Sequence, residues 1–351
     1  MKYPYLSEED RQKMLLPPTG KIRVVIDSDT FNEVDDQFAV SYALMSREKL
    51  QVEAVYAAPF SSGFFDELVS SDEAAAPMTS DIEEGLEQSY QEILKIYDKL
   101  ELSPEGKVFR GSKSYLKDKD TPIESDAARD LVKKAMESEE VLYVAALGEI
   151  TNIASAILME PEIIKKIVIV WLAGQPLHWP HALEFNLGQD VMASQIILDS
   201  GVPLVLVPCM AVASHLLTTG AELRECLQGR SKIGTFLADT VIKELTPEAA
   251  NNMLSLFRLT YLRELDDYDK TIQGKSEFSA MASSRIIWDI SVIGYLVNPL
   301  WCPSNLIEAP SLTDDIKWGN RANAHHIRIC NYVYRDGIFG DMFEKLSKAP
   351  K

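Results

Sequence analysis

Short, β-branched apolar runs alternate with helical patterns over the first 210 residues, and this alternation restricts the fold more than any other feature of the sequence. The apolar runs lie at 21–27, 52–58, 141–147, 167–173 and 203–209. Helical spacing separates them at 35–46, 81–100, 125–138, 151–158 and 190–200. Strands that alternate with helices pair in parallel, with helices on both faces of the sheet. We therefore predict an α/β fold with a mostly parallel central sheet and a Rossmann-like core.

The remaining sequence fits the same unit, because no stretch of the 351 residues has the composition of a linker. Residues 1–20 are a polar N-terminal extension, and residues 215–300 form a mainly helical region. Helices are predicted there at 221–228, 232–244, 247–265 and 287–297. A last strand near 325–334 and a short terminal helix follow. We predict a single domain spanning residues 1–351.

The charge balance excludes several classes of partner. Acidic residues number 53 against 35 basic ones, which gives a formal net charge of −18. Such a surface repels nucleic acid and anionic membranes but not a neutral small molecule or a divalent cation. The four cysteines form no C-x-x-C pair, so they predict no zinc site. The first residues lack the apolar segment of a signal peptide, and we therefore expect a cytoplasmic protein.

An aspartate cluster follows the first predicted strand. Asp27, Asp29, Asp35 and Asp36 lie in the segment D-S-D-T-F-N-E-V-D-D. Carboxylates gathered at the end of a strand raise one another's pKa, and a hard divalent cation with oxygen ligands relieves that repulsion. The segment therefore predicts a metal site. The simpler interpretation is a solvated acidic turn whose charges favour the N-terminus of the following helix.

A second interpretation of the same segment is a phosphatase of the haloacid dehalogenase type. Those enzymes place a nucleophilic aspartate and an acid aspartate in a D-x-D motif after a strand, here Asp27 and Asp29. They also favour threonine or valine where this chain has Phe31, and they do not require the adjacent pair Asp35 and Asp36. The acidic surface argues against a phosphorylated substrate.

Four separated motifs resemble the inosine-uridine preferring nucleoside hydrolase family. They are the D-x-D…D-D segment at 27–36, L-G-E-I-T-N-I-A at 147–154, E-F-N-L-G-Q-D at 184–190 followed by D-S-G-V-P at 199–203, and W-D at 288–289. They occur in the family's order. The resemblance implies a nucleoside hydrolase-like fold and calcium-dependent hydrolysis of the N-glycosidic bond of a ribonucleoside, a reaction of nucleoside salvage. It also implies a homodimer or homotetramer.

The resemblance implies a role for each matched residue. The calcium ligands would be the side chains of Asp29, Asp36 and Asp289 and the carbonyl oxygen of Leu147. Asp29 would also take a proton from the attacking water. The sugar contacts would come from Asp35 and Asn186 at the ribose hydroxyls and from Glu184 at the 5′ end, while Asp27 would anchor the site from behind. Because Glu184 and Asn186 are two residues apart, we expect an extended segment that directs both to one face.

The chain also departs from the family pattern. The loop between Asp29 and Asp35 holds five residues, longer than the family's, so Asn32 or Glu33 can enter the pocket. Trp288 stands where the family usually has a histidine that protonates the leaving base; tryptophan cannot titrate but can stack on a flat ring. His178 or His181 is a candidate replacement for that acid. These changes suit a modified or non-standard nucleoside, or alternatively a protein that binds ribose without turning it over.

Overall fold

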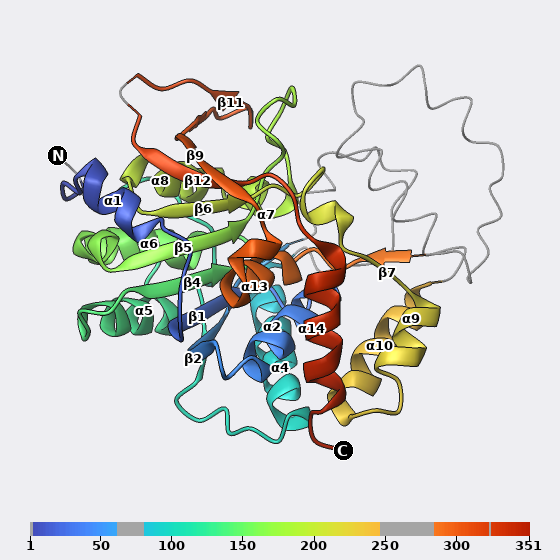
Figure 1. Ribbon diagram of the computed structural model, residues 1–351. Helices are drawn as coiled ribbons and strands as arrows, with labels where there is room; N and C mark the ends of the chain where they lie inside the picture. Colours follow the sequence, from blue (N-terminus) through green and yellow to red (C-terminus); the bar gives the residue numbers. More distant parts are fainter. Residues whose placement is uncertain (1–2, 62–80, 246–283, 323) are drawn as a thin grey trace, which may run out of the picture.

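The computed structural model describes residues 3–61, 81–245, 284–322 and 324–351. Within these residues, eight strands form one central sheet in the order β3-β2-β1-β4-β5-β6-β12-β9 (Figure 1). Their bounds are β1 Ile22–Ser28, β2 Leu50–Ala57, β3 Val108–Arg110, β4 Leu142–Ala146, β5 Ile167–Leu172, β6 Leu204–Val207, β9 Ser304–Glu308 and β12 His326–Cys330. Every neighbouring pair is parallel except β12 with β9. The predicted α/β fold is thus confirmed.

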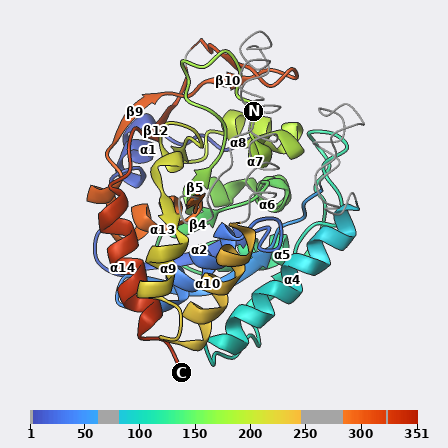
Figure 2. The same ribbon diagram turned by 90° about the vertical axis from the view of Figure 1, so that its right-hand side faces the viewer.

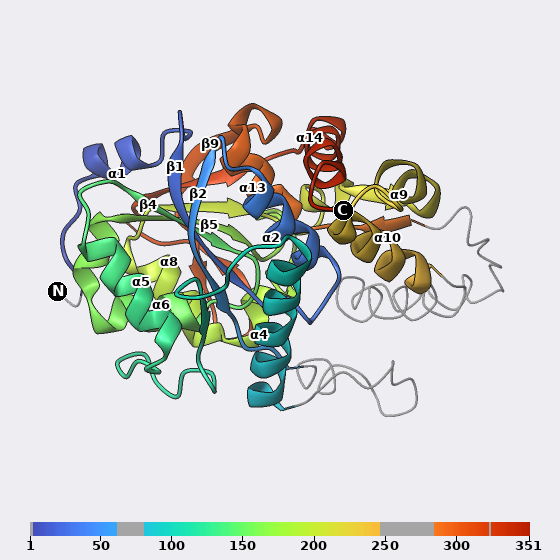
Figure 3. The ribbon, with the colours of Figure 1, turned by 90° about the horizontal axis from the view of Figure 1, so that it is seen from below.

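Helices cover both faces of this sheet, as Figure 3 shows from below. One face carries α2 Asp35–Met45, α4 Ile82–Lys99, α9 Gly220–Cys226, α10 Lys232–Glu244, α13 Ile290–Val297 and α14 Arg335–Ser347. The opposite face carries α5 Asp126–Met136, α6 Thr151–Met159 and α8 Val191–Ser200. In the first group, α4, α10 and α14 each contact α2, which they surround in Figure 2.

The strands read as unbroken apolar runs because both of their faces are buried. In β1, Val24 and Ile26 pack into the core beneath α2, whereas Val25 packs into the core beneath α5 and α6. All three side chains are fully buried. Alternate side chains of one strand therefore hold the two helix layers together, and the carboxyl end of β1 is fixed between them.

In the region 215–300, the structure describes residues 215–245 and 284–300. Helices α9, α10 and α13 lie in it, but a small antiparallel pair, β7 Leu217–Thr219 with β8 Ser284–Ile286, lies there as well. The helix predicted at 247–265 falls outside the described residues. Four further strands were not predicted: β3, β9, β10 Ser311–Leu312 and β11 Trp318–Gly319. All of them except β9 have only two or three residues, which is too few for a clear periodicity.

The N-terminal extension is partly ordered into a helix. Helix α1 spans Glu8–Met14 and begins at the N-cap Ser7. Glu8 accepts a hydrogen bond of 2.9 Å from the His326 ring, and Arg11, only 5 % exposed, donates to the carbonyl oxygen of Gly201. These contacts fasten α1 to the sheet beside β12. None of the described helices is both long and apolar enough to cross a bilayer.

Candidate active site

The aspartate cluster lies at the carboxyl end of β1, where parallel sheets bind ligands. Asp27 belongs to β1, Asp29 follows the strand, and Asp35 and Asp36 form the first turn of α2. All four side chains are at most 3 % exposed. A solvated acidic turn would leave them in water, so that interpretation is wrong.

Asp289 joins the cluster from the other end of the chain. It is the N-cap residue of α13, and its backbone N–H donates to Oδ2 of Asp35 at 3.2 Å. One carboxylate oxygen from each of Asp35, Asp36 and Asp289 lies within 4.8 Å of the other two. This triplet, found among the described residues, is close enough to share one metal ion. It contains Asp35, for which we expected a sugar contact, and it does not contain Asp29.

The charges of these carboxylates oppose one another. Burial raises the pKa of Asp36 to about 7, although the Ser28 hydroxyl donates to it at 2.6 Å and favours its charged form. Burial and the neighbouring acidic groups raise the pKa of Asp29, Asp35 and Asp289 well above the ordinary value. A divalent cation would offset the unfavourable free energy of burying these negative charges together. Calcium and magnesium both prefer a set of oxygen donors such as this one.

Asp29 packs against the turn between β4 and α6. A Cβ atom added at Gly148 would lie 2.5 Å from Oδ1 of Asp29, so only glycine leaves room for this carboxylate. Oδ2 of Asp29 is buried and has no hydrogen-bond partner among the described residues. A buried carboxylate oxygen without a donor is costly unless a cation or a proton lies beside it. The metal predicted at Asp29 therefore fits the residues present.

Asp27 is held from behind the cluster. The Asn152 side-chain amide donates to Oδ1 of Asp27 at 2.8 Å and to the Ala57 carbonyl oxygen at 3.2 Å. The Ser112 backbone N–H in turn donates to Oδ1 of Asn152 at 2.7 Å. Burial raises the pKa of Asp27 to about 7. Asn152 thus ties the start of α6 to β1, through Asp27, and to β2, through Ala57.

Glu184 and Asn186 are not on an extended segment, which corrects our prediction. Glu184 is the N-cap of the short helix α7 Phe185–Gln189, and its carboxylate accepts the backbone N–H groups of Gly174, Asn186 and Leu187 at 2.9, 3.0 and 3.1 Å. Asn186 lies inside that helix, and its amide donates to the carbonyl oxygens of Leu147 and Leu172 at 2.6 and 2.9 Å. The carbonyl oxygen of Leu147, a predicted metal ligand, therefore accepts a hydrogen bond from Asn186, a predicted sugar contact.

Comparison with known proteins identifies the family. Residues 24–302 match the family model described as inosine-uridine preferring nucleoside hydrolase. The chain belongs to this family. Its match to pyrimidine-specific ribonucleoside hydrolases RihA is short: 33% identity over 88 residues with that of Enterobacter sp. (strain 638), and 32% with that of Escherichia coli O1:K1 / APEC. The aligned stretch covers 24% of this chain and 28% of each relative.

Solved nucleoside hydrolases share the fold over nearly the whole chain. The plant nucleoside hydrolase PpNRh1 matches with a TM-score of 0.63 and 18% identity, over 93% of this chain and 99% of its own. The purine-preferring ribonucleoside hydrolase from Gardnerella vaginalis matches with a TM-score of 0.64 and 18% identity, over 93% and 98%. The type III effector protein XopQ complexed with adenosine diphosphate ribose matches with a TM-score of 0.56 and 14% identity, over 97% and 96%. The phosphatase interpretation has no support from these matches.

The residues that depart from the nucleoside hydrolase pattern occupy different settings. Trp288 is 7 % exposed and directly precedes Asp289. Asn32 is half-buried, and its side-chain oxygen has no partner among the described residues. His178 is exposed in the loop between β5 and α7, and the His181 ring, half-buried, lies 6.2 Å from the Trp179 ring. Only Trp288 is thus enclosed in the core beside the carboxylates.

Glu149 is a buried acidic residue beside the cluster that the sequence analysis overlooked. It is fully buried, and its Oε2 lies 2.5 Å from the Thr151 hydroxyl, which also lies 2.5 Å from Oδ2 of Asp190. Burial and the neighbouring Asp190 raise the pKa of Glu149 well above its ordinary value. Its signal in the sequence is an acidic residue inside the family's G-x-L-T-N segment.

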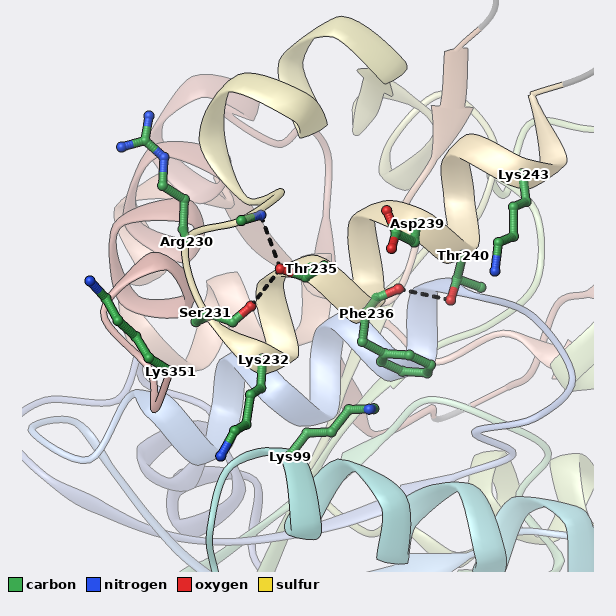
Figure 4. Close-up of a pocket in the computed structure, with 11 residues that line it drawn as sticks. Lys99, Arg230, Ser231, Lys232, Thr235, Phe236, Asp239, Thr240, Lys243 and Lys351 are labelled. Atoms are coloured by element: carbon green, nitrogen blue, oxygen red, sulfur yellow. Dashed lines mark hydrogen bonds between the residues drawn. The ribbon is translucent and has the colours of Figure 1, made fainter.

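A surface hollow of about 590 Å³ lies away from this site. Figure 4 shows its lining at the end of α4 and the start of α10, where Lys99, Arg230, Lys232 and Lys351 point in different directions. Helix α4 starts after the carboxyl end of β2, so its last residue, Lys99, lies at the opposite edge of the sheet. The Lys232 ammonium is already paired with Glu101 at 2.6 Å. This hollow does not gather charges around one point and is not a candidate active site.

Proposed function

We propose that this chain hydrolyses the N-glycosidic bond of a ribonucleoside to ribose and a free base, with a calcium ion at the carboxylate cluster. The observation that carries the proposal is the convergence of Asp35, Asp36 and Asp289 in a member of the nucleoside hydrolase family. The relatives that it resembles are named for either pyrimidine or purine nucleosides. Their names therefore do not select a base for this chain.

The donor set is compatible with calcium, the ion that we propose. We propose that the side chains of Asp29, Asp36 and Asp289 and the carbonyl oxygen of Leu147 hold the ion. All of these donors are oxygen atoms, and calcium accepts six to eight of them in flexible geometry. When bound, the ion lowers the pKa of the attacking water and fixes a vicinal diol of the sugar.

Asp29 is the proposed general base. Its Oδ2 is buried and has no donor among the described residues, so this oxygen can accept the proton of the attacking water. Cleavage of an N-glycosidic bond develops positive charge on the ribose ring, and the surrounding acidic groups stabilise that charge more than they stabilise the neutral substrate. Asp27 keeps β1 in place behind Asp29 through its hydrogen bond to Asn152.

The sugar contacts follow the same family pattern. We propose that Asp35 accepts from a ribose hydroxyl, that the Asn186 amide turns from the carbonyl oxygen of Leu147 to the sugar, and that Glu184 reaches the 5′ end. Glu184 is fixed by three backbone N–H groups, and burial raises its pKa to about 7. A carboxyl group that is so poised near neutral pH can either accept from or donate to a hydroxyl group.

The leaving base would meet groups that differ from the usual ones. Trp288 offers a flat apolar wall in place of a proton donor, and Asn32 offers an amide from the longer loop. His178 or His181 would then supply the proton to the departing base. A modified or non-standard base, rather than inosine or uridine, fits this altered wall. We further propose a homo-oligomer, which sedimentation of the purified chain tests.

The test of this function is sugar release. Purified protein, treated with EDTA and then supplied with calcium, is incubated with a panel of purine, pyrimidine and modified ribonucleosides, and reducing sugar is assayed. We expect calcium-dependent release from at least one of them, and its loss in Asp29→Asn and Asp289→Asn. The exposed helix residue Asp126 provides the control, since Asp126→Asn leaves every proposed contact intact. Release that is unchanged in Asp29→Asn would overturn the mechanism.

Trp288 favours one second candidate function, a ribose-binding protein without turnover. A buried tryptophan directly before Asp289 cannot protonate a leaving base. In that case calorimetry would show ribose or nucleoside binding that depends on calcium, while no nucleoside in the panel releases sugar. Restoring the usual residue with Trp288→His would then confer or raise hydrolysis.

A further inference from the structure

Two bridges join the same pair of distant segments at the carboxylate cluster. One is the hydrogen bond from the Asp289 backbone to Asp35 at 3.2 Å. The other is an ion pair in which Nη2 of Arg285 donates to Oε2 of Glu33 at 2.8 Å. Each bridge connects the stretch before or at the start of α2 with the stretch that leads into α13. These two stretches carry all three residues of the metal-sized triplet.

The ion pair is shielded from water. The Arg285 side chain is 11% exposed and that of Glu33 is 27% exposed, so salt and solvent screen the pair less than an exposed one. Arg285 belongs to β8, where it is opposite Thr218 of β7, so its backbone is fixed by a strand pair. Glu33 instead belongs to the five-residue loop between Asp29 and Asp35, which lies outside regular structure. Arg285, fixed on β8, therefore restricts the positions that Glu33 and its loop can take.

We propose that Arg285 is a positioning residue, which through Glu33 holds the long Asp29–Asp35 loop in the conformation that presents Asp36 to the metal and Asp35 to the sugar beside it. The carboxylates of Asp35, Asp36 and Asp289 repel one another, and this repulsion pushes their two segments apart when no cation is present. The Glu33–Arg285 pair opposes that separation from one side. This inference rests on the proposed metal site.

A purely electrostatic role makes a different prediction from a positioning role. If only the field of these two charges mattered, removing the Arg285 cation would strengthen calcium binding, and removing the Glu33 anion would weaken it. If the pair positions the loop, both single changes weaken binding. The double variant then loses no more calcium affinity than either single variant, because each single change already removes the shared contact.

The experiment measures calcium affinity by isothermal titration calorimetry and thermal unfolding without calcium, on the full chain. We expect Arg285→Gln and Glu33→Gln each to lower the affinity about tenfold, with Glu33→Gln/Arg285→Gln no lower, and Arg285→Lys to recover part of it. Glu33→Asp keeps the charge but shortens the side chain, so it also weakens binding under this proposal. If Arg285→Gln does not fold, Glu33→Asp tests the same proposal.

The matched control is the ion pair between Nε of Arg23 and Oε1 of Glu53 at 2.7 Å, whose side chains are 13% and 15% exposed. It joins β1 and β2 near the amino end of β1, so Arg23→Gln and Glu53→Gln should leave calcium affinity unchanged. Tighter binding by Arg285→Gln, or unchanged binding by Glu33→Asp, overturns the positioning role alone. Absence of calcium binding by the unmodified chain overturns the metal site and this role together.

Discussion

The backbone N–H of Asp289 donates to Oδ2 of Asp35 although the two residues are 254 positions apart in the sequence. The bond brings the first turn of α2 and the N-cap of α13 face to face. Helix N-termini carry partial positive charge, which favours carboxylates placed there. The two helix N-termini therefore reduce the repulsion among the buried carboxylates but do not remove it. A cation would neutralise the repulsion that remains.

Stability without metal should fall as the pH rises from about 4.5 to about 7. Burial raises the pKa of Glu184 from 4.5 to about 7, so the unfolded chain loses this proton before the folded chain does. The unfolding free energy therefore declines across that window, by about 3 kcal/mol from this group, and is level above it. Urea unfolding of EDTA-treated protein at several pH values measures the slope. Asp27 and Asp36, whose pKa burial also raises to about 7, contribute to the same decline. Glu184→Gln should therefore make the slope shallower without abolishing it, and parallel curves for the two proteins would contradict the assignment.

Gly148→Ala should disable the site with little change in the fold. The added Cβ would lie 2.5 Å from Oδ1 of Asp29, so that carboxylate must move. We expect calcium affinity to fall about tenfold or more, equivalent to at least about 1.4 kcal/mol. Calorimetry gives the affinity. The control is Gly340→Ala in α14, where an added Cβ meets nothing within 4 Å.

Asn152→Ala should destabilise the whole protein. The change removes the donor to Asp27 and to the Ala57 carbonyl oxygen, and it removes the acceptor of the Ser112 N–H. Buried polar groups left without partners cost about 1–3 kcal/mol each, so we expect a loss of about 2–4 kcal/mol in the free energy of unfolding. Urea denaturation measures it. A loss below about 0.5 kcal/mol would mean that Asp27 is not anchored in this way.

His178→Ala tests whether His178, in the loop before α7, donates the proton to the leaving base. If His178 protonates the leaving base, kcat on an ordinary ribonucleoside should fall by about 10²–10⁴-fold. A p-nitrophenyl riboside, whose leaving group departs as a stable anion, should be hydrolysed at an unchanged rate. His181→Ala is the companion variant. Equal losses on both substrates would assign His178 to binding or folding instead.

The sequence was sufficient for features that have a local signature. The alternating apolar runs predicted the parallel sheet, and the position of Asp27 and Asp29 at the end of β1 placed the acidic cluster at the correct edge. The resemblance to nucleoside hydrolases, now shown as family membership, added Asp289 from far along the chain. The expected roles of the individual residues remain predictions.

Features made by distant or very short segments could not be predicted. The Glu33–Arg285 pair joins positions 252 apart. Glu33 lies in the aspartate segment and was expected to enter the pocket, but nothing in the sequence links it to Arg285. Helix α7 has only five residues, F-N-L-G-Q, so its spacing does not distinguish it from an extended segment. The contact of Asp190 with Thr151, next to Glu149, joins residues 39 positions apart and is seen only in the folded chain.

The long separation between Asp35 and Asp289 has a consequence for biosynthesis. Ribosomes release α2 with its two aspartates long before the segment that forms α13. Until that segment arrives, the nascent polypeptide lacks one carboxylate of the triplet, and the metal cannot template the early sheet. The proposed ion therefore cannot meet all of its carboxylates until Asp289 has been synthesised, and a chain stalled before that residue lacks a complete site however well its first strands have folded.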